Sequence, residues 1–175
     1  MPTKGNPFLN FPNKVFIETG SHTGDGIQKA IEANFEQIIS IEIADIYFNH
    51  CKNKFFIYDH VEIVQGDSFK VLPSILEKID HPITFWLDGH HSCGNTGIGE
   101  YWAPLIQELE AISKHHVKTH TILIDDMRCW KDPNPNHGFI TEDILEVIHQ
   151  INPDYNISYI DGCQADDIMV AQVGK

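Results

Sequence analysis

Short apolar runs rich in β-branched residues alternate along the chain with segments whose apolar residues recur every three to four positions. The runs at 15–18, 38–42, 61–66, 83–88 and 121–125 are expected to form strands. All but one are nearly uninterrupted, which is typical of strands that are covered on both faces in a parallel sheet. The run at 61–66 alternates instead, which is typical of a strand nearer the edge of the sheet.

Helical periodicity separates these runs. Apolar residues at i, i+4 and i+8 begin at Ile27 and again at Val71, where Ser68 is placed to cap the second helix. Pro104 suits the first turn of a further helix, and Thr141 is placed to cap the next one. Strands and helices therefore alternate, which predicts an α/β fold with a doubly wound, three-layer arrangement.

The end of the chain departs from this alternation. Two strand-like runs at 156–162 and 167–173 are joined by a short turn segment. They are expected to form an antiparallel hairpin on an otherwise parallel sheet. Because the chain carries no internal repeat and no linker long enough to divide it, residues 1–175 are expected to form one domain.

Composition and charge narrow the possible partners. The 175 residues include 25 acidic and 12 basic side chains, which give a formal net charge of −13 with histidine neutral. Nucleic-acid binding needs clustered Lys and Arg, so we expect no nucleic-acid partner. No apolar run approaches the roughly 18 residues needed to cross a bilayer, so we expect no membrane partner.

The chain is expected to be cytoplasmic. Its first residues lack the continuous apolar core of a secretion signal. Its four cysteines are widely spaced and form no C-x-x-C pair, which is typical of free thiols in a reducing compartment.

The first three strands end in residues that suit a nucleoside ligand. Gly20 and Gly24 follow the first strand at the start of a helix, where free N–H groups favour polar ligands, although a plain tight turn is the alternative. Glu42 ends the second strand about twenty residues later, the place of a ribose-binding acid in nucleoside-binding α/β folds. Asp67 and Ser68 follow the third strand, where capping the next helix and reading an adenine edge are both open.

At these positions the chain resembles the class I S-adenosylmethionine-dependent methyltransferases. The resemblance implies that S-adenosyl-L-methionine is the cofactor, and that a seven-stranded sheet has the order 3-2-1-4-5-7-6. Asp88, after the fourth strand, is expected to contact the cofactor as well. The residues that carry the resemblance are Glu18, Thr19, Gly20, Ser21, His22, Thr23 and Gly24 in the first loop, Glu42 for the ribose, and Asp67 and Ser68 for the adenine side.

Carboxylates also follow the fourth and fifth strands. Asp88 ends one run, and Asp125 and Asp126 end the next. If these strands are neighbours, the three carboxylates converge and repel one another unless a cation lies between them. Oxygen ligands with room for water suit Mg²⁺ or another divalent cation. Alternatively, the acidic pair caps the following loop and pairs with Arg128.

This arrangement narrows the resemblance to metal-dependent small-molecule O-methyltransferases, including the macrocin and novobiocin types. The resemblance implies that Asp88, Asp125 and Asp126 hold the metal ion. His90 stands where the sugar enzymes have a second acid, so His90 or His91 is expected to take the proton of the acceptor hydroxyl. The expected function is therefore methyl transfer from S-adenosylmethionine to a hydroxyl of a small molecule. Arg128 orients an anionic group or neutralises the acidic pair.

Two other classes of protein remain open. A metal-dependent hydrolase or phosphoryl-transfer enzyme could use the same aspartates without a ribose-binding acid. An inactive nucleoside-binding module would bind the cofactor and ignore metal.

Histidines and tryptophans outside these motifs have simpler interpretations. His115, His116 and His120 fall near a helix end, where protonated imidazoles interact favourably with the helix dipole, and this interpretation is preferred to metal binding. Trp102 and Trp130 accompany the two irregular segments at 89–101 and 127–139, where substrate shielding and simple packing are both open. Cover for the acceptor is expected from these segments or from a second copy of the chain in a homo-oligomer.

Overall fold

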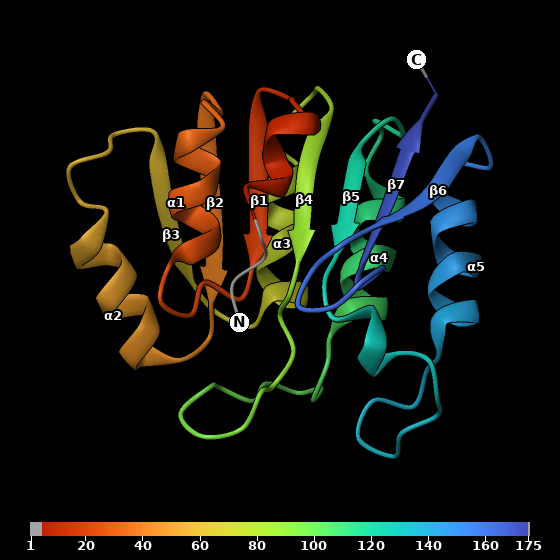
Figure 1. Ribbon diagram of the computed structural model, residues 1–175. Coiled ribbons are helices and arrows are strands. Elements are labelled where there is room, and N and C mark those ends of the chain that lie inside the picture. Colours follow the sequence, from red (N-terminus) through yellow and green to blue (C-terminus); the bar gives the residue numbers. More distant parts are fainter. Residues whose placement is uncertain (1–4, 175) are drawn as a thin grey trace.

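The computed structural model describes residues 5–174, so residues 1–4, on which part of the secretion-signal expectation rests, lie outside it. Its centre is a seven-stranded sheet with the predicted order β3-β2-β1-β4-β5-β7-β6 (Figure 1). Pairs among the first five strands are parallel, and β7 is antiparallel to both β5 and β6. The strands are β1 (Val15–Thr19), β2 (Gln37–Glu42), β3 (Val61–Gln65), β4 (Ile83–Leu87), β5 (Thr121–Ile124), β6 (Tyr155–Ile160) and β7 (Ile168–Val173). The predicted fold class is confirmed, and β3 is an edge strand as its alternation predicts.

Helices cover both faces of the sheet (Figure 1). The helices are α1 (Asp25–Glu32), α2 (Asp45–Lys54), α3 (Ser68–Leu76), α4 (Leu105–Lys114) and α5 (Thr141–Ile151). The α1 and α2 side chains share one buried cluster with the short turn Pro7–Asn10, and those of α3, α4 and α5 share the other. No helix within residues 5–174 is long and apolar enough to cross a membrane, and no disulfide joins the cysteines of this region.

The apolar pattern does not predict α2. Ile46, Tyr47 and Phe48 follow one another instead of recurring at helical spacing, and Ile46 is 57% exposed. Cys51 is the fully buried side chain that ties the helix to the sheet. Periodicity failed here because the helix lacks an apolar stripe, and tertiary contacts with β2 and β3 hold it in place.

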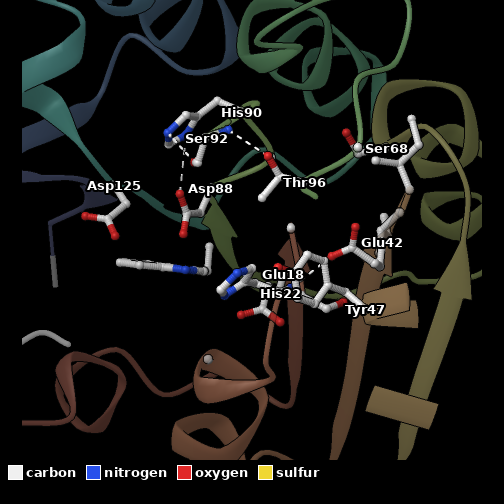
Figure 2. Close-up of a pocket in the computed structure, with 18 of the residues that line it drawn as sticks. Glu18, His22, Glu42, Tyr47, Ser68, Asp88, His90, Ser92, Thr96 and Asp125 are labelled. Atoms are coloured by element: carbon white, nitrogen blue, oxygen red, sulfur yellow. Dashed lines mark hydrogen bonds and ion pairs between the residues drawn. The ribbon is translucent and has the colours of Figure 1, made fainter. Parts of the chain in front are cut away.

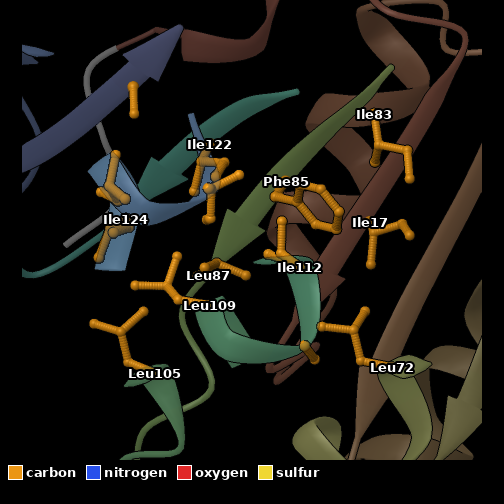
Figure 3. Packing of buried hydrophobic residues seen from close by; sticks show 14 of the residues in the cluster. Ile17, Leu72, Ile83, Phe85, Leu87, Leu105, Leu109, Ile112, Ile122 and Ile124 are labelled. Atoms are coloured by element: carbon orange, nitrogen blue, oxygen red, sulfur yellow. The ribbon is translucent and has the colours of Figure 1, made fainter. Parts of the chain in front are cut away.

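The larger of the two buried clusters fixes the positions of the strands whose ends carry the loops. Leu72 of α3 and Leu109 and Ile112 of α4 are fully buried against Ile17 of β1 and Phe85 of β4 (Figure 3). Burying each such side chain stabilises the fold by roughly 1.5 to 3 kcal/mol. The loops after β1, β3 and β4 therefore start from a rigid base.

Both predicted hydroxyl caps are wrong, because tertiary partners take the hydroxyl groups. Thr141 Oγ1 donates to the Trp130 carbonyl at 2.9 Å, and the Ile140 N–H donates to the Asp143 carboxylate at 2.8 Å instead. Ser68 is the first residue of α3, and its hydroxyl donates to the buried Glu108 carboxylate. Each hydroxyl therefore joins separate parts of the fold.

A buried pair of histidines joins β4 to the end of α4. The Ile83 N–H donates to His120 Nδ1 at 3.1 Å, so His120 must carry its proton on Nε2. That Nε2 faces His115 Nδ1 at 3.0 Å, and His115 Nε2 in turn faces the Ile79 carbonyl at 2.8 Å. Burial lowers the pKa of His120 to about 3, so the prediction of a protonated imidazole is wrong for His120.

The lowered pKa of His120 predicts acid sensitivity. His120 takes up a proton near its ordinary pKa of about 6.5 in the unfolded chain, but only near 3 in the folded protein. Its stabilising contribution is therefore complete above pH 6.5 and is lost as the pH falls towards 3. Relative to a His120→Gln variant, the parent protein should lose about 2 kcal/mol of unfolding free energy between pH 8 and pH 5.

Urea denaturation across this pH range measures the difference between the two proteins. His116→Gln is the matched control, because His116 is exposed and lies beside the pair. Parallel pH curves for the parent and the His120→Gln variant would contradict the assignment.

Candidate functional site

The carboxyl ends of β1 to β5 open into one cavity of about 470 Å³. This volume lies within the roughly 300 to 1,000 Å³ that small-molecule sites occupy. Figure 2 shows Glu42 and Ser68 towards one end of this cavity and Asp88 and Asp125 towards the other. Of the two candidate bases, His90 lines the cavity and His91 is not among its lining residues.

The loop after β1 approaches β4 so closely that it needs glycine. Gly20 has a φ of +85°, and a Cβ built on it would lie 2.5 Å from the Asp88 carbonyl oxygen. Gly24 has a φ of +82°, and its N–H donates to the Ser21 carbonyl at 2.8 Å before α1 begins. Any larger residue at Gly20 would push the two loops apart and reshape the cavity between them.

Glu18 places a buried carboxyl group under this loop. Ser40 Oγ donates to its Oε2 at 2.5 Å, and the Ser21 hydroxyl bonds to Ser40 at 2.6 Å. A Cβ on Gly26 would lie 1.7 Å from Glu18 Oε1, so the glycine lets the start of α1 reach the carboxyl group. Burial raises the pKa of Glu18 to about 8, and the charge of Glu42 adds to the shift. A cation that enters the cavity would favour the ionised form.

Glu42 lies at the predicted end of β2 and lines the cavity. Its Oε2 accepts the His22 N–H at 2.9 Å, and its Oε1 accepts the Ala44 N–H at 2.8 Å. Each carboxylate oxygen has a second acceptor position, so both oxygens can still receive a hydroxyl group. The two backbone bonds hold the carboxylate in a fixed direction.

The segment after β4 crosses to the ends of β2 and β3. The Glu100 N–H donates to Asp67 Oδ2 at 3.1 Å, and the Glu100 carboxylate lies 2.9 Å from Lys70 Nζ. Gly97 packs so closely against Ile43 that a Cβ would lie 2.4 Å from its methyl group. Asp67 therefore anchors the segment that covers this end of the cavity.

Glu108 is a buried residue that supports the loops around the cavity without lining it, and the sequence analysis missed it. Its carboxyl group accepts hydrogen bonds from Ser68 and Thr19, and a Cβ on Gly89 would lie 2.9 Å from its Oε1. It therefore ties together the loops after β1, β3 and β4. The available signal was a charged residue on the apolar stripe of a helix, between Leu105 and Ile112.

The acidic residues after β4 and β5 meet, but not as the predicted set of three. His90 lies between two carboxylates, with Nδ1 3.4 Å from Asp88 and Nε2 3.2 Å from Asp126. These three residues form one compact group of potential metal ligands within the described chain, and Asp125, Asp126 and Asp167 form another. Burial raises the pKa of Asp88 well above its ordinary value, and burial raises that of Asp125 to about 6.

Arg128 is occupied by acidic partners. Its guanidinium group lies 2.6 Å from Asp126 Oδ1 and also pairs with the fully buried Asp167. These contacts favour the neutralising role over the recognition of an anionic substrate. Asp126 keeps its other oxygen towards His90.

Aromatic rings surround His90. Its ring centre lies 5.8 Å from that of Trp102 and 5.6 Å from that of Trp130. Trp130 is buried and donates from Nε1 to the Asp125 carbonyl at 3.1 Å, whereas Trp102 is half-buried and lines the cavity. His91 instead bonds within its own segment, with Nδ1 3.2 Å from the Gly97 carbonyl. Packing therefore explains the role of Trp130, whereas substrate shielding remains open for Trp102.

The fold is similar to that of solved methyltransferases. An O-methyltransferase from Bacillus cereus in complex with S-adenosylhomocysteine gives a TM-score of 0.63 at 12% identity, over 92% of this chain and 74% of that chain. The N-methyltransferase NodS from Bradyrhizobium japonicum gives 0.58 at 10% identity, over 95% and 90%. A Clostridium thermocellum protein, named provisionally as an rRNA methylase, gives 0.62 at 16% identity, over 94% and 91%.

The chain therefore has the class I S-adenosylmethionine-dependent methyltransferase fold, as the resemblance in sequence implies. No protein-family profile matches the sequence, and no curated protein matches it. The fold is shared by enzymes with different acceptors, so the reaction has to be argued from the residues of the site.

Glu108 gives a prediction about stability. Its folded-state pKa of about 7 lies above its ordinary value, so its contribution to stability falls as the pH rises from about 4.5 to 7. A Glu108→Gln variant cannot titrate. Its unfolding free energy relative to the parent should therefore increase by about 2 kcal/mol between pH 5 and pH 8.

Denaturation of both proteins at several pH values checks this. Glu110→Gln is the control, since Glu110 is exposed on the same helix. An equal pH dependence in the Glu108 and Glu110 variants would show that Glu108 is not the buried acid described here.

Proposed function

We propose that the protein transfers a methyl group from S-adenosylmethionine to a hydroxyl of a small molecule. The observation that carries the proposal is the convergence of Gly20, Glu18 and Glu42 on the same cavity as Asp88 and His90. Gly20, Glu18 and Glu42 suit the methyl donor. Asp88 and His90 lie where an acceptor would meet it.

The donor fits the chemistry of this cavity. Glu42 offers fixed acceptor positions for the two ribose hydroxyls. Gly20 removes the Cβ that would fill the approach to Asp88. The sulfonium and ammonium groups of the donor are cations, and the carboxyl groups of Glu18 and Asp88 are available to them.

A divalent cation also fits the acceptor end. Asp88, His90 and Asp126 each offer one ligand atom, and these atoms lie within 4.8 Å of one another. Two carboxylates and one imidazole suit Mn²⁺ at least as well as Mg²⁺, because nitrogen ligands favour the softer ions. A bound ion would lower the pKa of the acceptor hydroxyl.

The residues of the chain would perform the remaining work. The cavity would hold the acceptor oxygen in line with the methyl group and the sulfur, so that the O–CH₃ bond forms as the S–CH₃ bond breaks. The sulfur leaves as the thioether of S-adenosylhomocysteine. His90, when it is not a metal ligand, would receive the hydroxyl proton on whichever ring nitrogen carries no proton, because a neutral imidazole keeps one nitrogen as an acceptor. The two neighbouring carboxylates, Asp88 and Asp126, would stabilise the imidazolium that forms.

The charge distribution supports a small-molecule acceptor over the alternatives. A nucleic acid or a phosphoryl group would face several carboxylates, while Arg128 is already paired with Asp126 and Asp167. The net charge of −13 adds to this repulsion. An inactive binding module remains distinguishable, because it would bind S-adenosylhomocysteine but release no methylated product.

Glu42 should favour ligands with an intact ribose over their 2′-deoxy analogues. Glu42→Ala should weaken S-adenosylhomocysteine binding by about 1.5 to 3 kcal/mol, the range for hydrogen bonds to a charged group. The parent should also bind S-adenosylhomocysteine more tightly than its 2′-deoxy analogue, and the variant should lose this preference. Calorimetry with both ligands measures the two effects.

Glu36→Ala is the control, because Glu36 is exposed just before β2. If the Glu42→Ala variant kept the full preference for the ribose, Glu42 would serve only to hold the His22 and Ala44 backbone groups.

Metal binding should appear in thermal stability. Millimolar-scale Mg²⁺ or Mn²⁺ should raise the melting temperature of the parent, because the folded state alone assembles the site. Asp88→Asn should respond less. Without metal, this variant should be at least as stable as the parent, because burial and like charges disfavour the Asp88 carboxylate.

Asp132→Asn is the matched control for a change on an exposed loop. A parent protein whose melting ignores Mg²⁺, Mn²⁺ and Ca²⁺ alike would remove the metal from the proposal and leave His90 as the base.

A further inference from the structure

Two groups of potential metal ligands lie side by side after β4 and β5, and one carboxylate belongs to both. Among the residues that the structure describes, the groups are Asp88, His90 and Asp126 on one side and Asp125, Asp126 and Asp167 on the other. Asp126 turns Oδ2 towards His90 Nε2, at 3.2 Å, and Oδ1 towards Arg128 Nη1, at 2.6 Å. A carboxylate that offers one oxygen to each side can serve two cation positions at once.

The second of these groups already contains a cation that belongs to the protein. Arg128 Nη1 contacts Asp126 Oδ1 and also donates to Asp167 Oδ2. One nitrogen atom therefore contacts two of the three carboxylates that form the group. A guanidinium group cannot be deprotonated in proteins, so the positive charge at this position is permanent.

Asp167 fixes the direction of this guanidinium group. Its side chain is fully buried at 0% exposure, whereas that of Arg128 is 35% exposed. Asp167 Oδ1 accepts the Arg128 N–H at 3.1 Å, and the Asp167 carbonyl accepts the Met127 N–H at 2.8 Å. A Cβ built on Gly162 would lie 3.1 Å from the Asp167 Cβ, so the turn between β6 and β7 closes over this carboxylate. The residue directly before β7 thus holds both the backbone and the side chain of Arg128.

Removal of the guanidinium group would leave the second group as an unneutralised cluster. Asp167 would stay fully buried beside Asp125 and Asp126 with no charged partner. A buried charge that has lost its partner destabilises the folded state, and stability returns when the group takes a proton or binds another cation. With Arg128 in place, a second divalent ion would have to break both of its ion pairs.

We infer that Arg128 is the resident cation of the second group, with Asp167 as its positioning residue, so that a metal ion binds only on the His90 side of Asp126. The inference rests on the metal site of the proposed function and deepens it, because it limits that site to a single ion. Hydrolases and phosphoryl-transfer enzymes with two metal ions hold them about 3.5 to 4 Å apart. Arg128 takes the place of one such ion, which separates this chain from that class of enzyme.

The test counts the metal ions that the full chain binds. Calorimetric titration with Mn²⁺ should give one ion per chain for the parent and a second ion for Arg128→Met, which removes the charge and keeps an unbranched side chain. Without metal, the variant should melt below the parent, and Mn²⁺ should raise its melting temperature by more than it raises that of the parent. Because both ions would share Asp126, electron paramagnetic resonance of the loaded variant should show magnetic coupling between them.

Two further variants show whether the second ion depends on this group. The double variant with Arg128→Met and Asp167→Asn should return to the parent's ion count, because the second position then lacks its buried carboxylate. Lys131→Met is the matched control for the loss of a positive charge, since Lys131 is exposed on the same loop, and it should also keep the parent's count.

Four results would overturn the inference. They are equal ion counts in the parent and Arg128→Met, two ions in the parent, an additional ion in Lys131→Met or in the double variant, and an Arg128→Met protein that stays unfolded in millimolar-scale Mn²⁺. In the last case a second ion would have failed to replace the guanidinium group.

The same titrations separate the inference from the proposed function. A parent that binds no Mn²⁺, together with an Arg128→Met variant that binds one ion, would remove the metal from the proposed function and support Arg128 as the resident cation. The gain of an ion in Arg128→Met, in a protein that binds no S-adenosylhomocysteine, would contradict methyl transfer and support the inference.

Discussion

The close approach of the β1 and β4 loops is the constraint on which the site depends. Parallel pairing places Thr19 opposite Leu87, so the two strands end together. Gly20 then lies directly against the Asp88 carbonyl, where no side chain would fit. The buried core fixes the positions of both strands. The gap between their loops is therefore set by packing and cannot widen freely. This contact brings the residues that follow β1 and those that follow β4 to one cavity.

Buried carboxyl groups organise the cavity from behind. Glu108 joins the loops after three strands, and Glu18 joins β1 to β2 through Ser40. Burial raises the pKa values of both groups, and a cation beside Glu18, which lines the cavity, would favour its ionised form. The same charge distribution disfavours anionic ligands.

Acidic side chains at the other end of the cavity are shared between competing partners. Asp126 contacts both His90 and Arg128, so a bound cation would have to share this carboxylate with the guanidinium group. The aromatic rings of Trp102 and Trp130 limit the movement of His90. The position of this imidazole therefore depends on packing as well as on charge, which couples the segments after β4 and β5.

The sequence by itself determined the class of fold, the sheet order through its resemblance, and the strand ends that carry Glu42, Asp88 and Asp125. The class of fold and the strand ends follow from local periodicity and from the rule that parallel strands end at one edge, whereas the sheet order is what the resemblance implies. Only the tertiary structure decided that Ser68 bonds to Glu108 instead of capping its helix, because that partner lies forty residues away in sequence. Long-range contacts likewise decide the buried histidine pair, the helix α2 and the two groups of acidic residues that share Asp126. Periodicity and motif spacing describe neighbours along the chain, whereas burial and hydrogen-bond partners arise only when distant segments pack together.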